Sequence, residues 1–462
     1  MESSPQRPGR ARQRQCVAVA SPPLRPTESV DCRFNQCIAG AAVVAYPAVS
    51  DYLTSREAVT LLGVKAQTLY AYASRGLVQS VPVRSGSKER YYLRSDVEKL
   101  RIRATARSGH GPAAAGALRY GEPVIASEIT ELTPNGHEYR GYLAADLARR
   151  CSFEQVATLL WTGTLDAAPA FWHLSQVLPE LEAGFSRQIL ATESDQSIVQ
   201  LFAAHALACE VGLLDAAPLA TGRTLVRRFA GCFGYFAPYA RYRAIRKGET
   251  IAAAVLKASE LPVEASALRA LDGALAILAD YELASATFVA RIAASCGANL
   301  SACIVAAIES SAGSVREHRR VESLLNGVRS IRMLRERVDA FRESGEVPPG
   351  FQPGLFAADD HRAAILLELA RLGGKGRKLV EIVDEFLAID AKGLGLYAKA
   401  PLGSVVFAQA LGLPSGASPG VFLLARTAGW VAHVLEQAAG GARLRPRAEF
   451  RRRKDAHVPQ IF

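Results

Sequence analysis

The sequence predicts an all-α protein of many medium-length helices, preceded by a small winged helix-turn-helix domain. Nearly half of the 462 residues are hydrophobic, which is enough to bury a large core and to form two or more domains. Only residues 122–131 and a few positions in the N-terminal part suggest strands. Apolar residues recur at the helical spacing i, i+3, i+4 through residues 143–214, 250–310, 360–390 and 402–440.

Changes in composition divide the chain into five parts. The start is rich in Pro, Arg and Ser without a sustained period, and a Gly/Ala/Pro/Arg-rich stretch later separates a compact module from the long helical part. We therefore expect a disordered basic tail at 1–47, a helix-turn-helix domain at 51–100, a linker at 101–117, a helical domain at 118–447 and a basic C-terminal tail at 448–462.

Positive charge is concentrated in the first quarter of the chain. Residues 1–117 carry 17 Lys+Arg and 8 Asp+Glu, a net charge of +9. Residues 118–462 carry 38 and 36, a net charge of +2, and the two sum to the +11 of the whole chain. We therefore expect a polyanion such as DNA to bind the N-terminal part. For residues 1–47 alone, a solvated tail is the simpler interpretation.

The sequence does not favour a membrane, secreted or metal-binding protein. The longest apolar stretch, residues 37–49, contains Pro47 and is too short to span a bilayer as a helix. No long apolar segment of a secretory signal follows the arginine-rich start, although an organelle transit peptide has a similar composition. The eight cysteines form no CxxC pair, so we expect no metal site, no disulfide framework and a reducing, cytoplasmic location.

The N-terminal module carries the signals of two short helices joined by a tight turn. Thr54-Ser-Arg-Glu57 is a capping box that opens the first helix, and Gly63-Val64 supplies the turn. The second helix is expected from Lys65 to about Arg75, with Gly76 ending it. This order of elements predicts a helix-turn-helix.

Three further stretches of the module resemble the MerR/excisionase type of winged helix. They are Tyr70–Leu77 (YAYASRGL), Lys88-Glu-Arg-Tyr-Tyr92 and Asp96-Val97. The resemblance implies that the second helix enters the major groove of DNA and that a basic wing touches the backbone or the minor groove. The residues expected to contact DNA are Lys65, Gln67, Thr68, Tyr70 and Tyr72 on the helix, and Arg84, Lys88, Arg90 and Tyr91 on the wing. Of Tyr70 and Tyr72, only one can face DNA.

Four segments of the helical part resemble the citrate synthase family, in the family's order and at its spacing. The first is Tyr139-Arg-Gly-Tyr142 followed by residues 152–161, and the second is residues 280–288 (DYELASATF), similar to DHELNASTF. The third is residues 350–363 (GFQPGLFAADDHRA), similar to GFGHxxY…DPRA. The fourth comprises Leu411-Gly-Leu-Pro414, Ala425-Arg-Thr-Ala-Gly-Trp430, His433 and residues 445–449. The resemblance implies the family's large and small helical domains over residues 118–447.

The resemblance also implies a reaction, which belongs to the tricarboxylic acid cycle. The family joins the methyl group of an acyl-CoA to the ketone of oxaloacetate. A carboxylate removes the methyl proton, one neutral histidine stabilises the enolate, and a second polarises the ketone. In this chain the matching positions are occupied by Arg316 (histidine of GPxHGG), Pro353 (histidine of GFGH) and Pro401 (aspartate), and a further histidine, that of DHEL, is Tyr281.

These replacements predict that no catalytic residue remains and that condensation does not occur at a useful rate. Proline can act neither as acid, nor as base, nor as a charge stabiliser. His318 lies two residues from the expected histidine and is the one imidazole that could swing in. Asp390 lies too far upstream to replace a carboxylate at position 401.

The arginines that hold substrate carboxylates in the family are all kept. The resemblance places them at Arg362, Arg426 and Arg445, where they could bind a di- or tricarboxylate without any chemistry. The alternative is that they are structural, paired with neighbours such as Glu436 or Glu449. His433, inside an apolar helix, is expected to be a core histidine.

Three functions remain open from the sequence. The first is a dimeric, carboxylate-sensing or DNA-binding regulator built on a degenerate citrate-synthase-like domain. The second is a working citrate or 2-methylcitrate synthase, and the third is a non-catalytic partner of an active citrate synthase paralogue. No cofactor is expected. Acyl-CoA is the family's substrate, but Glu317 and Arg319, where the family has glycine, weaken the expectation that CoA binds.

Overall fold

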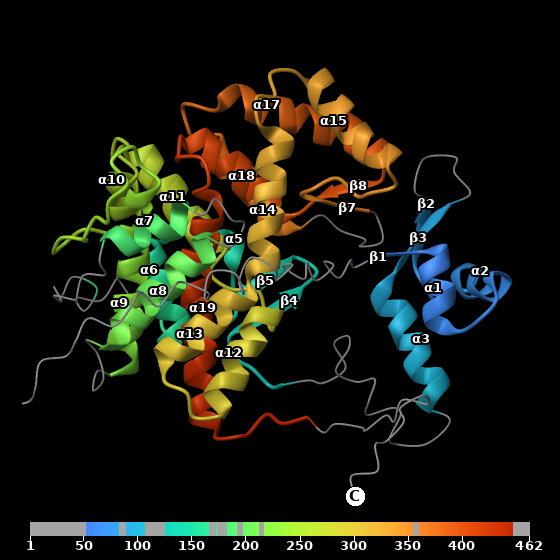
Figure 1. The fold of residues 1–462 in the computed structure, drawn as a ribbon, viewed down its shortest axis with the longest axis horizontal. Helices are drawn as coiled ribbons and strands as arrows, with labels where there is room; N and C mark the ends of the chain where they lie inside the picture. Colours follow the sequence, from blue (N-terminus) through green and yellow to red (C-terminus); the bar gives the residue numbers. More distant parts are fainter. Residues whose placement is uncertain are drawn as a thin grey trace, which may run out of the picture. The chain divides into compact units, whose positions relative to one another are not determined.

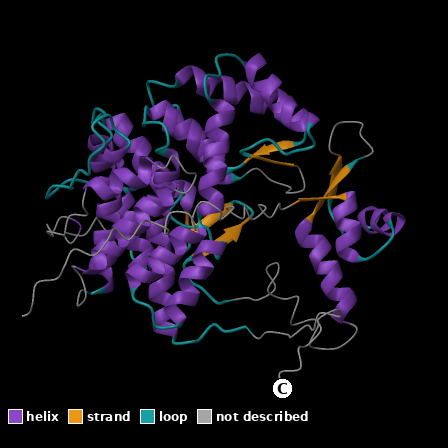
Figure 2. Cartoon of the chain, viewed as in Figure 1, coloured by secondary structure: helices purple, strands orange, loops and turns teal. Residues whose placement is uncertain are grey.

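The protein is described here from a computed structural model. It describes residues 52–82, 89–106, 125–165, 172, 183–191, 197–211, 217–353 and 360–446. The two basic tails, the wing tip at 83–88 and most of the expected linker lie outside this part of the chain. Figure 1 shows the elements in chain order, and Figure 2 shows how few of them are strands.

The N-terminal domain combines three helices with a small antiparallel sheet. Its elements are β1 (Tyr52–Thr54), α1 (Ser55–Leu62), α2 (Ala66–Ser74), β2 (Ser80–Pro82), β3 (Arg90–Leu93) and α3 (Arg94–Ala106), and the strand order is β1-β3-β2. Thr54 caps α1, since its hydroxyl accepts the Glu57 amide while the Glu57 carboxylate accepts the Thr54 amide. Gly63 then adopts the left-handed conformation (φ +67°) that turns the chain toward α2.

The last helix of the N-terminal domain runs into the expected linker. Helix α3 continues through Ala106, so residues 101–106 are helical. The stretch contains no proline or glycine before Gly109, so nothing in the chain ends the helix where the change in composition begins.

The rest of the described chain is a bundle of many helices with two minor sheets. The sheets are β4 (Thr130–Thr133), β5 (Gly136–Tyr139) and β6 (Tyr142–Leu143), in that order, and the pair β7 (Phe351–Pro353) and β8 (Leu396–Ala398). Of the strand suggested at 122–131, the described part is residues 125–131, and of these only the last two belong to β4, because the turn Pro134-Asn135-Gly136 places the hairpin further along the chain.

The helices of the bundle are short to medium in length. They are α5 (Ala144–Arg150), α6 (Phe153–Thr162), α7 (Ala183–Ala191), α8 (Ser197–Val211), α9 (Pro218–Cys232), η2 (Phe233–Tyr235), α10 (Ile251–Ala258), α11 (Ala265–Ile277), α12 (Ser285–Ser295), α13 (Leu300–Ser310), α14 (Ala312–Leu325), α15 (Ile331–Glu343), α16 (His361–Ala370), α17 (Arg377–Phe386), η3 (Leu387–Ala391), α18 (Ala400–Leu411) and α19 (Ser418–Gly440).

Helix α19 runs through the centre of the bundle and is buried on nearly every side. It contacts α6, α9, α11, α12, α13 and α18. A helix that is apolar all round can only be a core helix, so the polar groups it carries need buried partners. Two of those polar groups, Arg426 and His433, belong to the candidate site. Among the described helices, none is both long enough and apolar enough to cross a membrane.

Candidate functional site

The site is built around the turn that follows α11. The Tyr139 hydroxyl in β5 lies 3.0 Å from both the amide and the carbonyl of Asp280, and so holds this turn in place. Two non-glycine residues here are left-handed, Arg140 (φ +51°) and Glu282 (φ +52°). Such strain persists only where the surroundings impose it, and it is concentrated at functional sites.

Asp280 is fully buried and receives three polar groups. The Thr130 hydroxyl donates to Oδ2 at 2.6 Å, and His433 Nε2 lies 3.2 Å from the same oxygen. Arg426 Nη1 lies 3.6 Å from Oδ1. Burial alone would raise the pKa of Asp280, but His433, Arg426 and Thr130 lower it to about 2. Asp280 is therefore a permanent buried anion at neutral pH.

His433 is held in one tautomer by its two neighbours. Arg291 Nε donates to Nδ1 at 3.0 Å, so Nδ1 accepts and the proton resides on Nε2, facing Asp280. Arg291 in turn pairs with Glu436 and donates to Gln437. Both ring nitrogens of His433 are occupied, which makes it a structural link rather than an acid or base.

Two of the arginines that the resemblance places as carboxylate ligands form ion pairs with partners other than those expected. Glu436 pairs with Arg291, not with a carboxylate-binding arginine, and Glu449 lies outside the described residues. Arg362 pairs instead with Asp360, and Arg426 faces Asp280.

Arg362 is fixed at the N-terminus of α16. Its Nε and Nη2 both donate to the Asp360 carboxylate at 2.9 Å, and its guanidinium lies 3.5 Å above the ring of Tyr281. Tyr281 stands where the resemblance places a histidine, so this replacement supplies a flat face for the arginine. Among the described residues, no hydrogen bond uses Arg362 Nη1.

Arg426 is the most unusual group of the site. It is 3 % exposed, and within the part of the chain that the structure describes its guanidinium makes no hydrogen bond. Its contacts are the 3.6 Å ion pair with Asp280 and the ring of Phe422, 5.5 Å away. Burial lowers the pKa of Arg426, with Asp280 opposing this and Arg362 adding to it. The two guanidiniums are therefore near enough for one to affect the charge of the other, and both have N–H groups that make no hydrogen bond to a described residue.

Arg445, the third expected carboxylate ligand, is not brought to this site. It is exposed on the segment that follows α19. The left-handed Gly441 (φ +65°) ends the helix, and the described residues after it, up to 446, are not helical.

The four positions where the resemblance places catalytic residues lie on different elements of the helical domain. Tyr281 lies under Arg362, and Arg316 is half-buried on α14. Pro353 is the last residue of β7, where its backbone pairs with Leu396. Pro401 is in the first turn of α18, a position that tolerates proline because no intrahelical hydrogen bond is lost there.

Asp360 is the carboxylate bound next to Pro401, and its oxygens are fully engaged. Four donors reach it: the amide, Nε and Nη2 of Arg362 and the amide of Ala400. Burial would raise the pKa of Asp360, but Arg362 and the Ala400 amide hold it below its usual range. A carboxylate stabilised in this way is a weak base.

His318 does not swing into the catalytic position. It is 2 % exposed in α14, its Nδ1 lies 2.8 Å from the Ser314 carbonyl, and its ring packs on Phe422. Burial lowers the pKa of His318 to about 4, so the imidazole is neutral. Nδ1 must be the donor to the carbonyl, which leaves Nε2 as an acceptor without a partner among the described residues.

The helix-turn-helix residues divide into three groups. Lys65, Gln67 and Tyr70 are exposed on α2, with Tyr70 49 % exposed, and Thr68 is half-buried. Tyr72 packs against the core of the domain, so of the two tyrosines Tyr70 is the one that stays exposed, and its contact with DNA remains a prediction. Arg84 and Lys88 lie outside the described residues.

The two remaining wing residues are engaged within the protein. Arg90 donates to the hydroxyl and carbonyl oxygens of Ser80 on the neighbouring strand, both at 2.8 Å. Tyr91 is buried, and its hydroxyl donates to the carbonyl of Gly345. Strand alternation turns Tyr91 away from α2, so in this arrangement its side chain faces the connection that contains Gly345.

Sequence reasoning missed the groups that surround the arginines. Asp280 stands directly before Tyr281, and Asp360 stands two residues before Arg362, so both lie in stretches that carry the resemblance. Their roles depend on other contacts: Asp280 accepts from Thr130 and His433, and Asp360 accepts from the Ala400 amide. These contacts join elements more than a hundred residues apart, or forty in the case of Ala400, so no local pattern could reveal them.

Comparison with known proteins identifies both parts of the chain. A model of the citrate synthase C-terminal domain matches residues 119–447, and a model of the MerR helix-turn-helix regulatory family matches residues 53–112. Citrate synthase 2 of Bacillus subtilis is 26% identical over 360 residues, covering 71% of this chain and 94% of its own. A 2-methylcitrate synthase of Mycobacterium tuberculosis is 24% identical, covering 74% and 92%.

Solved structures share the fold. Citrate synthase from Thermotoga maritima superposes with a TM-score of 0.59 at 21% identity, covering 73% of this chain and 96% of its own. The Thermoplasma acidophilum enzyme, solved with carboxymethyl coenzyme A and oxaloacetate, gives 0.61 at 18% identity, covering 74% and 97%. The chain therefore belongs to the citrate synthase family, and a MerR-type helix-turn-helix domain precedes the family's domain.

Proposed function

We propose that this chain is a non-condensing member of its family that binds a di- or tricarboxylate and acts as a dimeric DNA-binding regulator. The helical domain is the sensor, and the helix-turn-helix domain is the output. The observation that carries the proposal is Arg426, a buried cation without a hydrogen bond in the described part of the chain.

A buried guanidinium without acceptors costs several kcal/mol of stability, and such groups persist where a ligand completes them. Arg426 lies close enough to Arg362 for the charge of Arg362 to lower the pKa of Arg426, and Arg362 Nη1 makes no hydrogen bond to a described residue. Two arginines with spare N–H donors suit the bidentate recognition of carboxylates. The ion pair between Arg426 and Asp280 is long, at 3.6 Å, which leaves most of the donors of Arg426 for a ligand.

Condensation lacks its base. Proton removal from a thioester methyl needs a carboxylate with a free lone pair, whereas Asp360 accepts four hydrogen bonds and Pro401 offers none. Each missing general acid or base costs about 10²–10⁴ in rate. Losing the base and both electrophilic histidines leaves only positioning of the substrates.

The decisive experiment is a thiol-release assay with acetyl- or propionyl-CoA and oxaloacetate, at high protein concentration. The Bacillus subtilis relative serves as the positive control. We expect no release above the rate without protein. Turnover within about 10²-fold of the control would refute the non-condensing proposal and favour a working synthase.

Ligand binding is tested separately by thermal shift. Citrate and oxaloacetate are expected to raise the melting temperature of the parent protein, with chloride at matched ionic strength as the control. A parent protein that shows no shift with any di- or tricarboxylate would end the sensing proposal.

DNA binding is tested on the region upstream of the chain's own gene. A single recognition helix binds weakly, so we expect a dimer to engage paired half-sites. Lys65 is exposed at the start of α2, and Lys65→Ala should weaken binding and lower the salt slope by about one. Lys257→Ala, which changes an exposed lysine of α10, is the matched control. Equal affinity of both variants for DNA would show that the start of α2 does not contact DNA.

A further inference from the structure

The sheet of the helix-turn-helix domain has a second apolar face. Side chains alternate along a strand, so β3 places Tyr92 on one face and its neighbours Tyr91 and Leu93 on the other. Tyr92 belongs to the core beneath α1 and α2. Tyr91 and Leu93 form a separate cluster with Tyr52 and Val81. A DNA-binding domain of this size does not need this second cluster for its own core.

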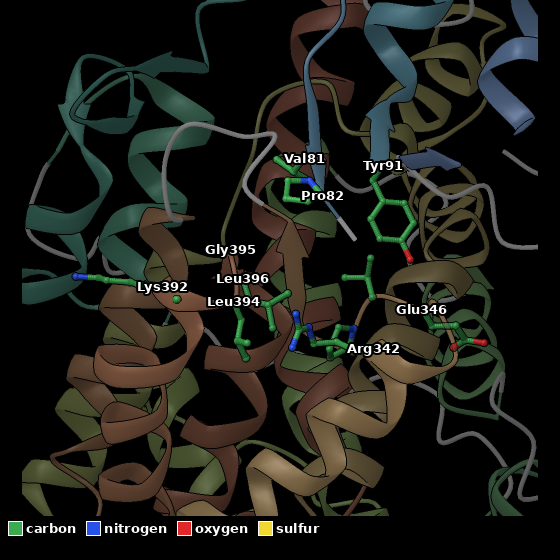
Figure 3. A pocket seen from close by; sticks show the side chains of 12 residues that line it. Val81, Pro82, Tyr91, Arg342, Glu346, Lys392, Leu394, Gly395 and Leu396 are labelled. Atoms are coloured by element: carbon green, nitrogen blue, oxygen red, sulfur yellow. The ribbon is translucent and has the colours of Figure 1, made fainter. Parts of the chain in front are cut away.

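A residue of the helical domain completes the cluster. Val347 packs against it, and the Tyr91 hydroxyl donates to the carbonyl of Gly345. Both residues lie in the connection between α15 and β7, which begins where the left-handed Gly345 (φ +77°) follows the helix. Figure 3 shows the Tyr91 hydroxyl directed at this connection. The contact leaves Tyr91 only 9 % exposed.

A pocket lies beside the contact. Val81, Pro82 and Tyr91 line it from the sheet, and Arg342, Glu346 and Leu394 line it from the helical domain (Figure 3). The two surfaces are therefore packed at the cluster but not along their whole length. A contact of this limited extent can open and close at low cost, unlike a continuous core.

The β7–β8 pair connects this contact to Arg362. The connection that carries Val347 leads into Phe351, which pairs with Ala398, and Leu396 at the far end of the pair lines the pocket. The chain leaves β8 at this same Phe351–Ala398 end, where the Ala400 amide donates to Asp360, which holds Arg362. Here the Lys399 amide also donates to the Gly350 carbonyl. A shift of Asp360 therefore reaches the contact through one short, hydrogen-bonded element.

We propose that the second apolar face of the helix-turn-helix sheet is a docking surface for the α15–β7 connection, and that the β7–β8 pair couples this docking to the Asp360–Arg362 pair. The surface fits a partner of mixed character, an apolar side chain flanked by a backbone carbonyl. Docking leaves α2 uncovered, since Lys65 and Tyr70 stay exposed, so the recognition helix is positioned rather than blocked. The inference rests on the proposed function only in that Arg362 is taken as part of the ligand site. The docking and the coupling can be tested without ligand or DNA.

Hydrogen exchange of the full chain tests the docking. Val347→Asp places a charge against the cluster, and Tyr91→Phe removes only the hydrogen bond. We expect amides of residues 90–93 and 345–347 to exchange about tenfold faster in Val347→Asp, and less so in Tyr91→Phe, with unchanged helical circular dichroism. Val263→Asp, at an exposed valine between α10 and α11, should leave both segments at the parent rate. Parent-like exchange of residues 90–93 in Val347→Asp would overturn the docking.

The coupling is tested with Asp360→Asn, which keeps the size of the side chain and weakens its hold on Arg362 and Ala400. We expect faster exchange in residues 396–400 and also in residues 90–93, which Asp360 does not touch. Loosening of 396–400 with parent-like exchange of 90–93 would overturn the coupling. A failure of the citrate thermal shift would instead count against the proposed function and leave these two results unchanged.

Discussion

Two sets of positions within the helical domain differ in how their surroundings hold them. The ionic corner, Asp280 with Arg426 and Asp360 with Arg362, consists of buried charges that pair with one another. The positions where the resemblance places catalytic residues hold two prolines, an arginine and a tyrosine, and of these Tyr281 contacts the corner beneath Arg362. The difference supports our proposal that carboxylate binding and proton transfer are separated in this chain. Removing one partner of a buried pair leaves a charge uncompensated, which is costly.

The largest effect is expected from the centre of the ionic corner. Asp280→Ala leaves Arg426 without a counter-charge and His433 without its acceptor. Breaking a buried pair by removing one partner costs about 3–5 kcal/mol, which urea unfolding would measure. Asp339→Ala, which removes an exposed pair with Arg342, should cost under about 1 kcal/mol. Equal losses of unfolding free energy in the two variants would show that the buried pair stabilises the fold no more than a surface pair does.

Arg426→Ala is expected to act on the ligand more than on the fold. Charge-assisted hydrogen bonds contribute about 1.5–3 kcal/mol each, so citrate should bind at least about tenfold more weakly. Calorimetric titration gives the affinity directly. Arg445→Ala, at the exposed third position, should leave the affinity of the isolated chain unchanged. A large loss in Arg445→Ala would mean that a partner subunit brings this arginine to the site.

A second buried aspartate sharpens the contrast with Asp280. Asp272 caps α6 by accepting the Phe153 amide, and burial, reinforced by Glu154, raises its pKa to about 7. The folded protein therefore binds a proton that the unfolded chain lacks between about pH 4 and 7. The ionised Asp272 carboxylate therefore destabilises the folded protein fully above pH 7, and this destabilisation disappears as the pH falls.

Asp272→Asn should accordingly stabilise the protein at pH 8 by about 1–2 kcal/mol, and the gain should shrink toward pH 5. Asparagine keeps an acceptor for the Phe153 amide without the charge. Thermal melts across this pH range measure the effect. A gain that is constant with pH would contradict the raised pKa of Asp272.

The smallest effect is expected at a replaced catalytic position. Arg316 stands half-buried on α14 where the resemblance places a histidine. Arg316→Ala should change both the free energy of unfolding and the citrate affinity by less than about 0.5 kcal/mol. A tenfold change in citrate affinity would bring Arg316 into the binding site and weaken the separation of the two sets of positions.

The helices could be predicted because their signals are local. The capping box at Thr54 and the helical period of residues 402–440 both depend on neighbouring residues, and both are present in the structure. The directions of Tyr72 and Tyr91 could not be predicted in the same way. Side chains alternate between the two faces of a strand and rotate around a helix. Which face is buried depends on the element that packs against it in the folded protein.

The sequence by itself determined that the chain combines a helix-turn-helix domain with a citrate synthase domain, and that proline occupies two of the family's catalytic positions. These conclusions need only the order and identity of residues. Tertiary structure decided that Asp360 is saturated, that Arg426 is buried without a hydrogen bond in the described part of the chain, and that Tyr91 faces Gly345. Burial and hydrogen bonding are properties of surroundings that segments far apart in the chain create together, so they exist only once the chain has folded.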